Sequence, residues 1–320
     1  MEYVKLGRNG IKVSRLSFGS WITFANQLDT HKAVECMGAA FDLGVNFFDN
    51  AEVYAGGKSE EVMGQALKKL GIPRLQYMVS TKFFWGIQNG VNSRNTLNRK
   101  YLMQAIDGSL ARLQMDFVDL AYCHRPDADT PIEETVWAMN DMIASGKALY
   151  WGTSEWSASE IEEAFAVCDR LSLRKPIVEQ PQYNLFSRER VEKEYAPLYE
   201  KRGIGLTTFS PLASGILTGK YLREIPAGTR LSQSSLGWLR DEAADPQKNS
   251  QVSAFVGLAK EFNCSPAQLA IAWCLRNPHV SSVITGASSK EQVVENMKAL
   301  NVFQRLDESA WTAVEKVFGT

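Results

Sequence analysis

Short apolar runs alternate with segments of helical periodicity along most of the chain. The runs are rich in β-branched and aromatic residues, a composition typical of buried strands. They begin near residues 16, 45, 77, 117, 148, 177, 204 and 280. Most of them are separated by a segment whose apolar residues recur at helical spacing. Strands that alternate with helices indicate a parallel sheet, and eight of them in a chain of 320 residues predict a (β/α)8 TIM barrel.

The predicted helices have recognisable start and stop signals. Asp29 or Thr30 can cap a helix that Gly44 ends, and Ser59 can cap the next helix, which Gly71 ends. Ser157 can cap a further helix. The other helices are expected at about 100–113, 132–143, 189–202, 250–262, 266–276, after Ser288, and at 307–318, so that extra helices follow the barrel at the C-terminal side. Between 213 and 248 we expect a long loop.

The N-terminal stretch 3–14 is predicted to be a β-hairpin that covers one end of the barrel, with Asn9-Gly10 as its turn signal. No linker divides the chain, so we expect a single domain over residues 1–320. A doubly wound sheet is the rival fold. It would need a glycine-rich turn after the first strand to bind a dinucleotide, and the chain has no GxGxxG. The segment Gly215–Lys220 is one residue too short for a phosphate-binding P-loop.

Composition excludes several classes of function. The chain has 35 basic and 36 acidic residues, which gives no electrostatic basis for binding nucleic acid or an anionic membrane. No apolar run reaches the roughly 20 residues that cross a bilayer, and the N-terminus has no signal-peptide core, so a cytoplasmic location without membrane insertion is expected. The five cysteines are widely spaced without CxxC, which predicts reduced thiols and no metal site.

Polar side chains follow three consecutive predicted strands. Asp49 ends the second strand with Tyr54 just beyond it, Lys82 ends the third, and His124 ends the fourth. In parallel α/β folds ligands bind at this end of the strands. The Lys82 ammonium would lower the pKa of Tyr54 from about 10, Asp49 would keep Lys82 charged, and His124 would orient a carbonyl oxygen. With a hydride donor alongside, these four residues predict a carbonyl-reducing site.

A second chemistry is left open by Glu155 and Glu179, which follow consecutive predicted strands. Paired carboxylates in a barrel mouth suggest glycoside hydrolysis. Gln180-Pro181 directly after Glu179, and the absence of an evident tryptophan cluster, make this the weaker alternative. Each member of the first set could also be a packing or turn residue by itself, and it is the combination that favours function.

The chain resembles the aldo-keto reductases over nearly its whole length. The matching segments are LSFGSW (16–21), FFDNAEVY (47–54), STK (80–82), SLARLQMDFVDL (109–120), HRPD (124–127), WGTSEWS (151–157), EQPQYN (179–184), FSPLASGILTGKY (209–221) and TGASSKEQVVEN (285–296). Within the family it is most similar to the branch of voltage-gated potassium channel beta subunits, through FFWG, EETVWAM, ALYWGTSEWS and IAWCLRN.

The resemblance implies a catalytic tetrad of Asp49, Tyr54, Lys82 and His124, with Tyr54 as general acid in the reduction of an aldehyde or ketone. It also implies NADPH bound across the barrel mouth. The implied contacts are Ser154, Glu155, Gln180 and Phe209 at the nicotinamide, Ser210, Leu212, Ser214 and Lys220 along the pyrophosphate, Arg230, Ser288 and Gln292 around the 2′-phosphate, and Glu295 and Asn296 at the adenine. Trp21, Asp49 and Gly286 are further implied contacts of the cofactor. The loop 213–248 would fold over the cofactor.

Two positions depart from the channel-subunit branch. His124 stands where that branch usually has Asn, which implies more reductase character than a channel accessory protein has. Glu155 stands where the branch tends to have Arg, which reverses a charge beside the cofactor. The runner-up function is a cofactor-sensing accessory subunit of a potassium channel with slow turnover, and the branch makes a homotetramer plausible. Trp21, Trp85 and Trp156 would line a pocket suited to apolar or aromatic aldehydes.

Overall fold

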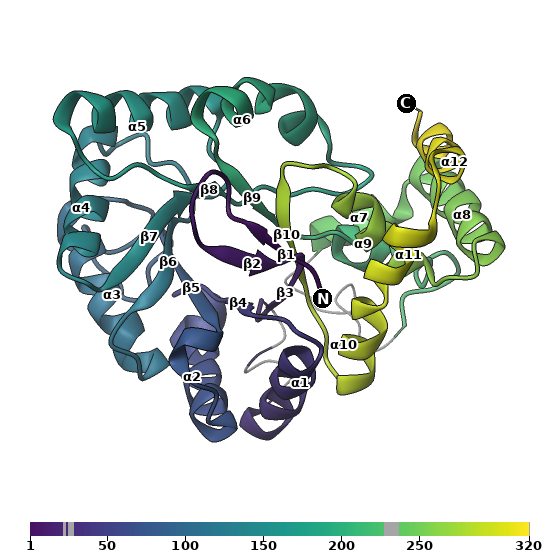
Figure 1. The fold of residues 1–320 in the computed structure, drawn as a ribbon, viewed down its shortest axis with the longest axis horizontal. Coiled ribbons are helices and arrows are strands. Elements are labelled where there is room, and N and C mark those ends of the chain that lie inside the picture. The colour runs from purple at the N-terminus through teal and green to yellow at the C-terminus, as the bar shows by residue number, and fades with distance from the viewer. Residues whose placement is uncertain (22–23, 25–28, 227–236, 320) are drawn as a thin grey trace.

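Eight parallel strands close into a barrel in the computed structural model, which describes residues 1–21, 24, 29–226 and 237–319. Around the barrel the order is β10-β3-β4-β5-β6-β7-β8-β9. The strands are β3 (Leu16–Gly19), β4 (Phe47–Asp49), β5 (Met78–Phe83), β6 (Val118–Cys123), β7 (Ala148–Thr153), β8 (Val178–Glu179), β9 (Gly205–Thr208) and β10 (Val280–Thr285). The predicted (β/α)8 barrel is confirmed, and each strand lies where an apolar run predicted one (Figure 1).

Helices α1 to α6 lie along the lower, left and upper sides of the barrel in Figure 1. They are α1 (Thr30–Asp42), α2 (Lys58–Leu70), α3 (Arg99–Leu113), α4 (Ile132–Ala144), α5 (Ala158–Leu171) and α6 (Ala196–Arg202). Asp29 and Ser157 cap α1 and α5, as their sequence predicts. The expected Ser59 cap is wrong, because α2 begins at Lys58 and its N-cap is Gly57 in the left-handed region.

The helix expected at 189–202 is interrupted. A π-helical turn, η3 (Arg190–Glu194), comes first, and α6 begins after Tyr195. Pro197 lies in the first turn of α6, where its missing N–H is tolerated, whereas within a continuous helix it would remove a hydrogen bond. The proline therefore separates two segments that hydrophobic spacing alone had joined.

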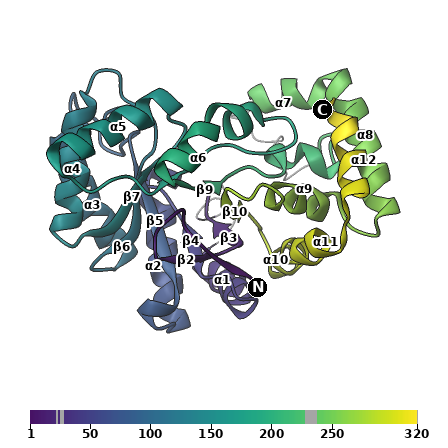
Figure 2. The same cartoon turned by 45° about the horizontal axis from the view of Figure 1, so that its top comes forward.

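Further helices follow the barrel strands at the C-terminal side, as expected. They are α7 (Gly237–Ala244), α8 (Pro246–Glu261), α9 (Pro266–Leu275), α10 (Lys290–Met297), α11 (Ala299–Arg305) and α12 (Glu308–Phe318). In Figures 1 and 2 α8 and α12 lie side by side at one edge of the molecule, and Phe255 and Phe318 pack with ring centroids 5.7 Å apart. The long loop expected over 213–248 is wrong in its described parts, which contain the 3-10 turns η4 (Ala213–Thr218), helix α7 and the start of α8.

The N-terminal hairpin covers the end of the barrel at which the strands begin. Strand β1 (Tyr3–Lys5) pairs with β2 (Lys12–Ser14), and Figure 1 shows this purple hairpin across the barrel end that faces the viewer. Leu6 and Val13 are fully buried against apolar side chains of the barrel interior, Phe47, Met78, Leu120, Tyr122, Ile177 and Val178. The predicted cap is thus confirmed, and it leaves the opposite end of the barrel open for a site.

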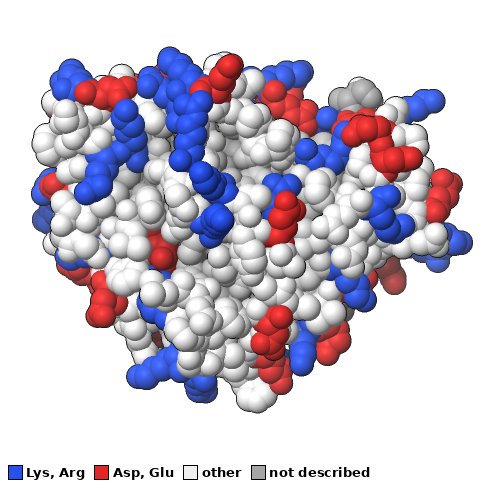
Figure 3. Space-filling model, viewed as in Figure 1, with Lys and Arg blue, Asp and Glu red and all other residues white. Residues whose placement is uncertain are grey.

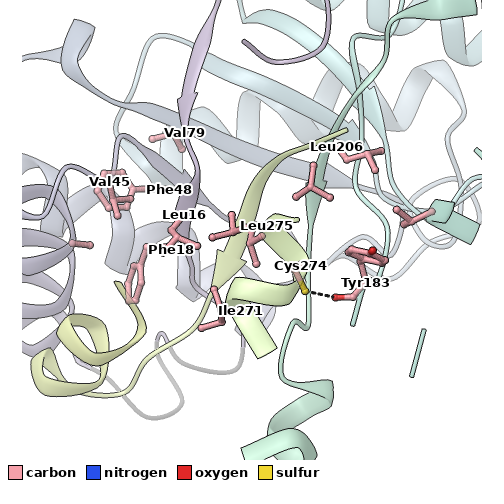
Figure 4. Close-up of a cluster of buried hydrophobic side chains, with 14 of the residues drawn as sticks. Leu16, Phe18, Val45, Phe48, Val79, Tyr183, Leu206, Ile271, Cys274 and Leu275 are labelled. Atoms are coloured by element: carbon pink, nitrogen blue, oxygen red, sulfur yellow. Dashed lines mark hydrogen bonds between the residues drawn. The ribbon is translucent and has the colours of Figure 1, made fainter. Parts of the chain in front are cut away.

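The main apolar core lies between the strands and the surrounding helices. Figure 4 shows Leu16 and Phe18 of β3 with Ile271 and Leu275 of α9 in this layer. Cys274 is buried there, with Sγ 3.5 Å from the carbonyl oxygen of Tyr183. All five cysteines are free thiols. On the face shown in Figure 3, acidic and basic side chains are both present and intermixed.

Candidate active site

Parallel strands bring Asp49, Lys82 and His124 to one end of the barrel. Asp49 is the last residue of β4, and its backbone is in register with Ser80 of β5. Lys82 lies two residues further along β5 and therefore on the same face as Ser80. His124 follows β6, and Tyr54 begins the turn η1 (Tyr54–Gly57) after β4. The four predicted tetrad residues are therefore brought together by three neighbouring strands.

A buried ion pair joins Lys82 to Asp49. The Nζ–Oδ2 distance is 2.7 Å, and Nζ also donates to the carbonyl oxygen of Asn50 at 2.8 Å. Oδ1 of Asp49 accepts hydrogen bonds from Ser80 Oγ at 2.7 Å and from Gln180 Nε2 at 3.1 Å. Burial disfavours the ammonium, but the charge of Asp49 and the hydrogen bonds to Asp49 and Tyr54 outweigh it, so the pKa of Lys82 is raised. Lys82 therefore stays charged inside the barrel.

Tyr54 lies against this ammonium. Its hydroxyl oxygen is 3.4 Å from Lys82 Nζ, which is itself 5.0 Å from the ring centroid. Burial raises the pKa of Tyr54, Lys82 lowers it and Asp49 raises it again, and the net pKa is above its ordinary value. The Lys82 ammonium lowers the pKa of Tyr54, as the sequence predicts, but burial raises this pKa by more. Tyr54 keeps its proton at neutral pH and can donate it.

His124 completes the group as a neutral imidazole. Its ring centroid is 5.9 Å from that of Tyr54 and 6.3 Å from that of Trp85. Burial, and then the charges of Lys82 and Arg125, hold the pKa of His124 well below its ordinary value. Its buried Nδ1 has no hydrogen-bond partner in the described part of the chain. A neutral ring with a free nitrogen can bond to a small polar ligand placed beside Tyr54.

The carboxylates of the alternative chemistry do not form a pair inside the barrel mouth. Glu179 precedes Gln180, which faces Asp49, so alternation along the strand sends Glu179 to the outside of the barrel. There it accepts hydrogen bonds from Thr153 Oγ1 at 2.5 Å and Tyr195 Oη at 3.4 Å, and burial raises its pKa to about 8. Because Glu179 faces the outside of the barrel, the barrel mouth lacks the pair of carboxylates that glycoside hydrolysis would need.

The family model described as "Aldo/keto reductase family" matches residues 15–318. The chain belongs to this aldo/keto reductase family. A protein of Oryza sativa subsp. japonica described as "Probable voltage-gated potassium channel subunit beta" is 54% identical over 99% of this chain and 96% of its own length. A protein of Arabidopsis thaliana with the same description is 52% identical over the same shares of the two chains. These matches support an oxidoreductase role and the use of a nicotinamide cofactor.

In this aldo/keto reductase the residues expected near the nicotinamide follow barrel strands at the end where Asp49 and Lys82 lie. Ser154 follows β7 and donates to the carbonyl oxygen of Gln180 at 2.9 Å. The Gln180 amide bonds Asp49 and lies 3.4 Å from Thr207 Oγ1, so it also braces the ion pair. Trp21 follows β3, and Phe209 follows β9 at the same end of the barrel.

Glu155 does not offer a free negative charge to the site. It has a left-handed backbone with φ of 59°. Its Oε1 accepts from the Gln182 backbone N–H at 2.5 Å, and its Oε2 lies 2.7 Å from Arg190 Nη1. Arg190 therefore neutralises the charge that distinguishes this chain from the channel-subunit branch. Arg190 could not be identified from sequence, because it is far from Glu155 along the chain and lies in the interrupted segment η3.

The residues expected along the pyrophosphate form a tight backbone loop. Ser210, Ser214 and Gly215 have φ of 58°, 57° and 97°, and Ser214 N–H donates to Ser210 Oγ at 3.2 Å. Leu212 precedes η4 as its N-cap. Lys220 folds back over this loop, because a Cβ added to Gly215 would come within 3.0 Å of its Nζ. Left-handed residues in such a turn can form a concave nest of N–H groups that suits an anion, so the loop fits a phosphate.

The residues expected around the 2′-phosphate and adenine lie on α10 or just before it. Ser288 donates to Gln292 Oε1 from its backbone N–H at 2.9 Å and from Oγ at 3.1 Å. The cap of α10 is Ser289, so Ser288 lies one residue before the cap and not at the helix terminus itself. Asn296 donates to the carbonyl oxygen of Gly286 at 3.2 Å.

Glu295 departs from this group, and Arg230 cannot be placed with it. Glu295 Oε1 accepts from Gln268 Nε2 of α9 at 2.6 Å, and its Oε2 pairs with Lys298. Arg230 and residues 227–236 of the expected loop lie outside the described residues. Across those that are described, no helix has the length and apolar character needed to cross a membrane, and no cluster of His, Cys, Asp and Glu could hold a metal ion.

Proposed function

We propose that this aldo/keto reductase reduces aldehydes or ketones to alcohols with NADPH, at a tetrad of Asp49, Tyr54, Lys82 and His124. The observation that carries the proposal is the contact of a protonated phenol with a buried ammonium: Tyr54 Oη is 3.4 Å from Lys82 Nζ, which Asp49 holds at 2.7 Å. Bound NADPH would supply the hydride. A site of this kind must supply the proton, and Tyr54 is the group placed to do so.

The proton transfer follows from the surroundings of Tyr54. Its raised pKa keeps the phenol protonated until a carbonyl oxygen gains negative charge. When the proton leaves, the phenolate forms beside the Lys82 ammonium, which stabilises it in a water-poor site. Asp49 keeps Lys82 in place, and neutral His124 can donate an N–H to the same carbonyl oxygen and fix its direction.

The preference for NADPH over NADH is part of the proposal. We assign the nicotinamide to Trp21, Asp49, Ser154, Gln180 and Phe209, the pyrophosphate to Ser210, Leu212, Ser214 and Lys220, and the adenosine 2′-phosphate to Gly286, Ser288, Gln292 and Arg230, with Asn296 and Glu295 near the adenine. Gln292 accepts two hydrogen bonds from Ser288, and this pairing leaves its amide N–H groups to face an anion. We assign Glu155 no contact with a particular part of the cofactor. It lies next to the site, and its charge is paired with that of Arg190.

A second function is favoured by the relatives, which carry the description of potassium channel beta subunits. The chain would then sense the state of its nicotinamide cofactor, with slow turnover, as an accessory subunit of a channel. The same likeness supports a homotetramer. Sedimentation equilibrium of the purified protein tests the assembly, and a monomer over the whole concentration range would contradict it.

Turnover and binding measured on one preparation separate the two functions. Near-ultraviolet absorbance follows NADPH oxidation with a reactive aromatic aldehyde, and fluorescence titration gives the affinity for NADPH. Turnover at an ordinary enzyme rate of about 1 s⁻¹ or more supports the reductase. Tight NADPH binding with negligible aldehyde reduction would overturn it in favour of the sensor.

A further inference from the structure

Arg125 is a cation beside the tetrad that the proposed mechanism does not use. It follows His124 directly at the exit of β6 and is half-buried. Its Nη1 donates to the carbonyl oxygen of His124 at 2.5 Å and lies 3.4 Å from Ser154 Oγ. Its Cζ is 5.9 Å from the centre of the Trp85 ring. The guanidinium therefore lies between the β6 and β7 exits, at the edge of the site.

The charge of Arg125 is not balanced by a carboxylate in the described part of the chain, where its hydrogen-bond acceptors are a carbonyl and a hydroxyl oxygen. Other half-buried arginines are paired. Arg112 pairs with Glu60, and Arg190 pairs with Glu155 and Glu194. A guanidinium carries five donors in a planar fork that matches a carboxylate, and a partly buried one without a counter-charge is costly. A partly buried guanidinium of this kind is typical of an anion-binding site.

Two further contacts place this anion site next to the reacting group. Trp85 packs edge-on to His124, with ring centroids 6.3 Å apart, and the Arg125 guanidinium lies over the Trp85 ring. The charge of Arg125 also contributes to the lowered pKa of His124 and partly offsets the raised pKa of Tyr54. A molecule whose carbonyl meets Tyr54 and His124 would extend along Trp85 towards Arg125.

We infer that Arg125 binds a carboxylate of the carbonyl substrate, so that the substrates of this site are aldehydes or ketones that also carry an acid group. This inference rests on the proposed function and names its substrate class. Trp85 supplies an aromatic wall for the body of such a molecule, and Arg125 supplies a charge-assisted, bidentate contact for its acid group. Arg125 is then a specificity residue, and Tyr54 remains the proton donor.

A matched pair of aldehydes separates the effect of a negative charge on the substrate from the effect of its size and shape. The substrates are 4-carboxybenzaldehyde and its neutral analogue methyl 4-formylbenzoate. The parent should have the higher kcat/KM for the acid. Arg125→Gln should lower kcat/KM for the acid by about 10- to 100-fold, mainly through KM, and change that for the ester by less than about threefold, because a charge-assisted contact contributes roughly 1.5–3 kcal/mol. Arg125→Lys should retain part of the preference.

Arg94→Gln is the control, because Arg94 contacts the same loop, at Trp85 O and Asn89 Oδ1, and is exposed. Arg94→Gln should leave kcat/KM unchanged for both aldehydes. Equal kcat/KM values for acid and ester in the parent, or an equal loss of both in Arg125→Gln, would overturn the assignment.

A binding measurement keeps this inference separate from the proposed function. The product alcohol 4-(hydroxymethyl)benzoate and its methyl ester are titrated calorimetrically with and without NADP⁺. Tighter binding of the acid by the parent, lost in Arg125→Gln, supports the carboxylate site even if neither aldehyde is reduced, in which case only the proposed function fails. Acid binding that is unchanged in Arg125→Gln would overturn the inference even if both aldehydes are reduced.

Discussion

The Lys82–Asp49 ion pair is the residue-scale feature on which the site depends. Both side chains are buried, and the Asp49 carboxylate has three side-chain partners, Lys82, Ser80 and Gln180. A buried pair gains little net stability, but the loss of one partner leaves an uncompensated charge. The geometry is therefore sensitive to any change that removes the negative charge and keeps the ammonium.

Asp49→Asn should lower the free energy of unfolding by about 3–5 kcal/mol, because the Lys82 ammonium is left buried without a counter-charge. It should also lower kcat by roughly 10²-fold or more, since Lys82 no longer stabilises a phenolate in a fixed position. Urea unfolding and steady-state kinetics measure the two effects. Ser80→Ala is the control: it removes a neutral donor to the same carboxylate and should cost about 1 kcal/mol. Equal costs for the two variants would contradict the account.

Glu179 predicts a specific dependence of stability on pH. Its pKa is about 8 in the folded protein, against an ordinary value of 4.5, because it is buried. The stability that comes from its protonated form is complete below pH 4.5 and is lost as the pH rises to about 8. Glu179→Gln removes this titration, so its unfolding free energy relative to the parent should increase by about 3 kcal/mol from pH 5 to pH 8. A difference that does not change with pH would show that Glu179 is not protonated in the folded state.

At the scale of elements, strands were easier to predict than turns. A strand of a parallel barrel is buried on both faces, so the apolar runs at β5, β6 and β10 mark it directly. The hairpin was predicted, but its left-handed residue is Gly7 and not the Asn9-Gly10 pair. The hairpin turn is shaped by its contact with the barrel, because Arg8 N–H donates to Gly203 O at 2.9 Å, and that contact cannot be inferred from a local motif.

Gly7→Ala should destabilise the protein by roughly 2 kcal/mol or more, because φ is +59° and a Cβ would come 2.3 Å from Gly203 O. Gly10→Ala is the matched control in the same turn. A Cβ there meets no atom within 4 Å, so the change should be neutral or slightly stabilising. Thermal unfolding compares the two variants. Both should keep the parent kcat/KM, since the hairpin covers the end opposite the site, and a loss of activity in folded Gly10→Ala would contradict that separation.

At the scale of the whole molecule, the barrel explains why the grouping of Asp49, Lys82 and His124 could be predicted from sequence and the contacts around them could not. Residues at the carboxyl ends of the strands meet at one mouth of a barrel regardless of loop conformation. Asp49, Lys82 and His124 were therefore predictable as a group. The pairing of Glu155 with Arg190 depends on how η3 folds back, and the net pKa of Tyr54 depends on its burial. Neither the Glu155–Arg190 pairing nor the net pKa of Tyr54 can be inferred from the spacing of residues along the chain.

NADPH should stabilise the whole protein more than NADH does. At a free concentration about 100 times Kd, a ligand that binds only the folded state adds about 2.7 kcal/mol, and the 2′-phosphate should give NADPH the lower Kd. Thermal unfolding with equal concentrations of the two cofactors measures the difference. The double variant Ser288→Ala and Gln292→Ala should reduce the difference in stabilisation between NADPH and NADH. Equal shifts for both cofactors in the parent would contradict the assigned phosphate site.

In the proposed reaction Tyr54 gives the proton as the hydride reaches the carbonyl carbon. A single-turnover experiment tests it most directly: enzyme preloaded with NADPH is mixed with an aromatic aldehyde, and the first loss of near-ultraviolet absorbance is timed for the parent and for Tyr54→Phe. Removal of a general acid should slow this step by about 10²- to 10⁴-fold while NADPH affinity stays unchanged. Equal first-turnover rates in the two proteins would contradict the account.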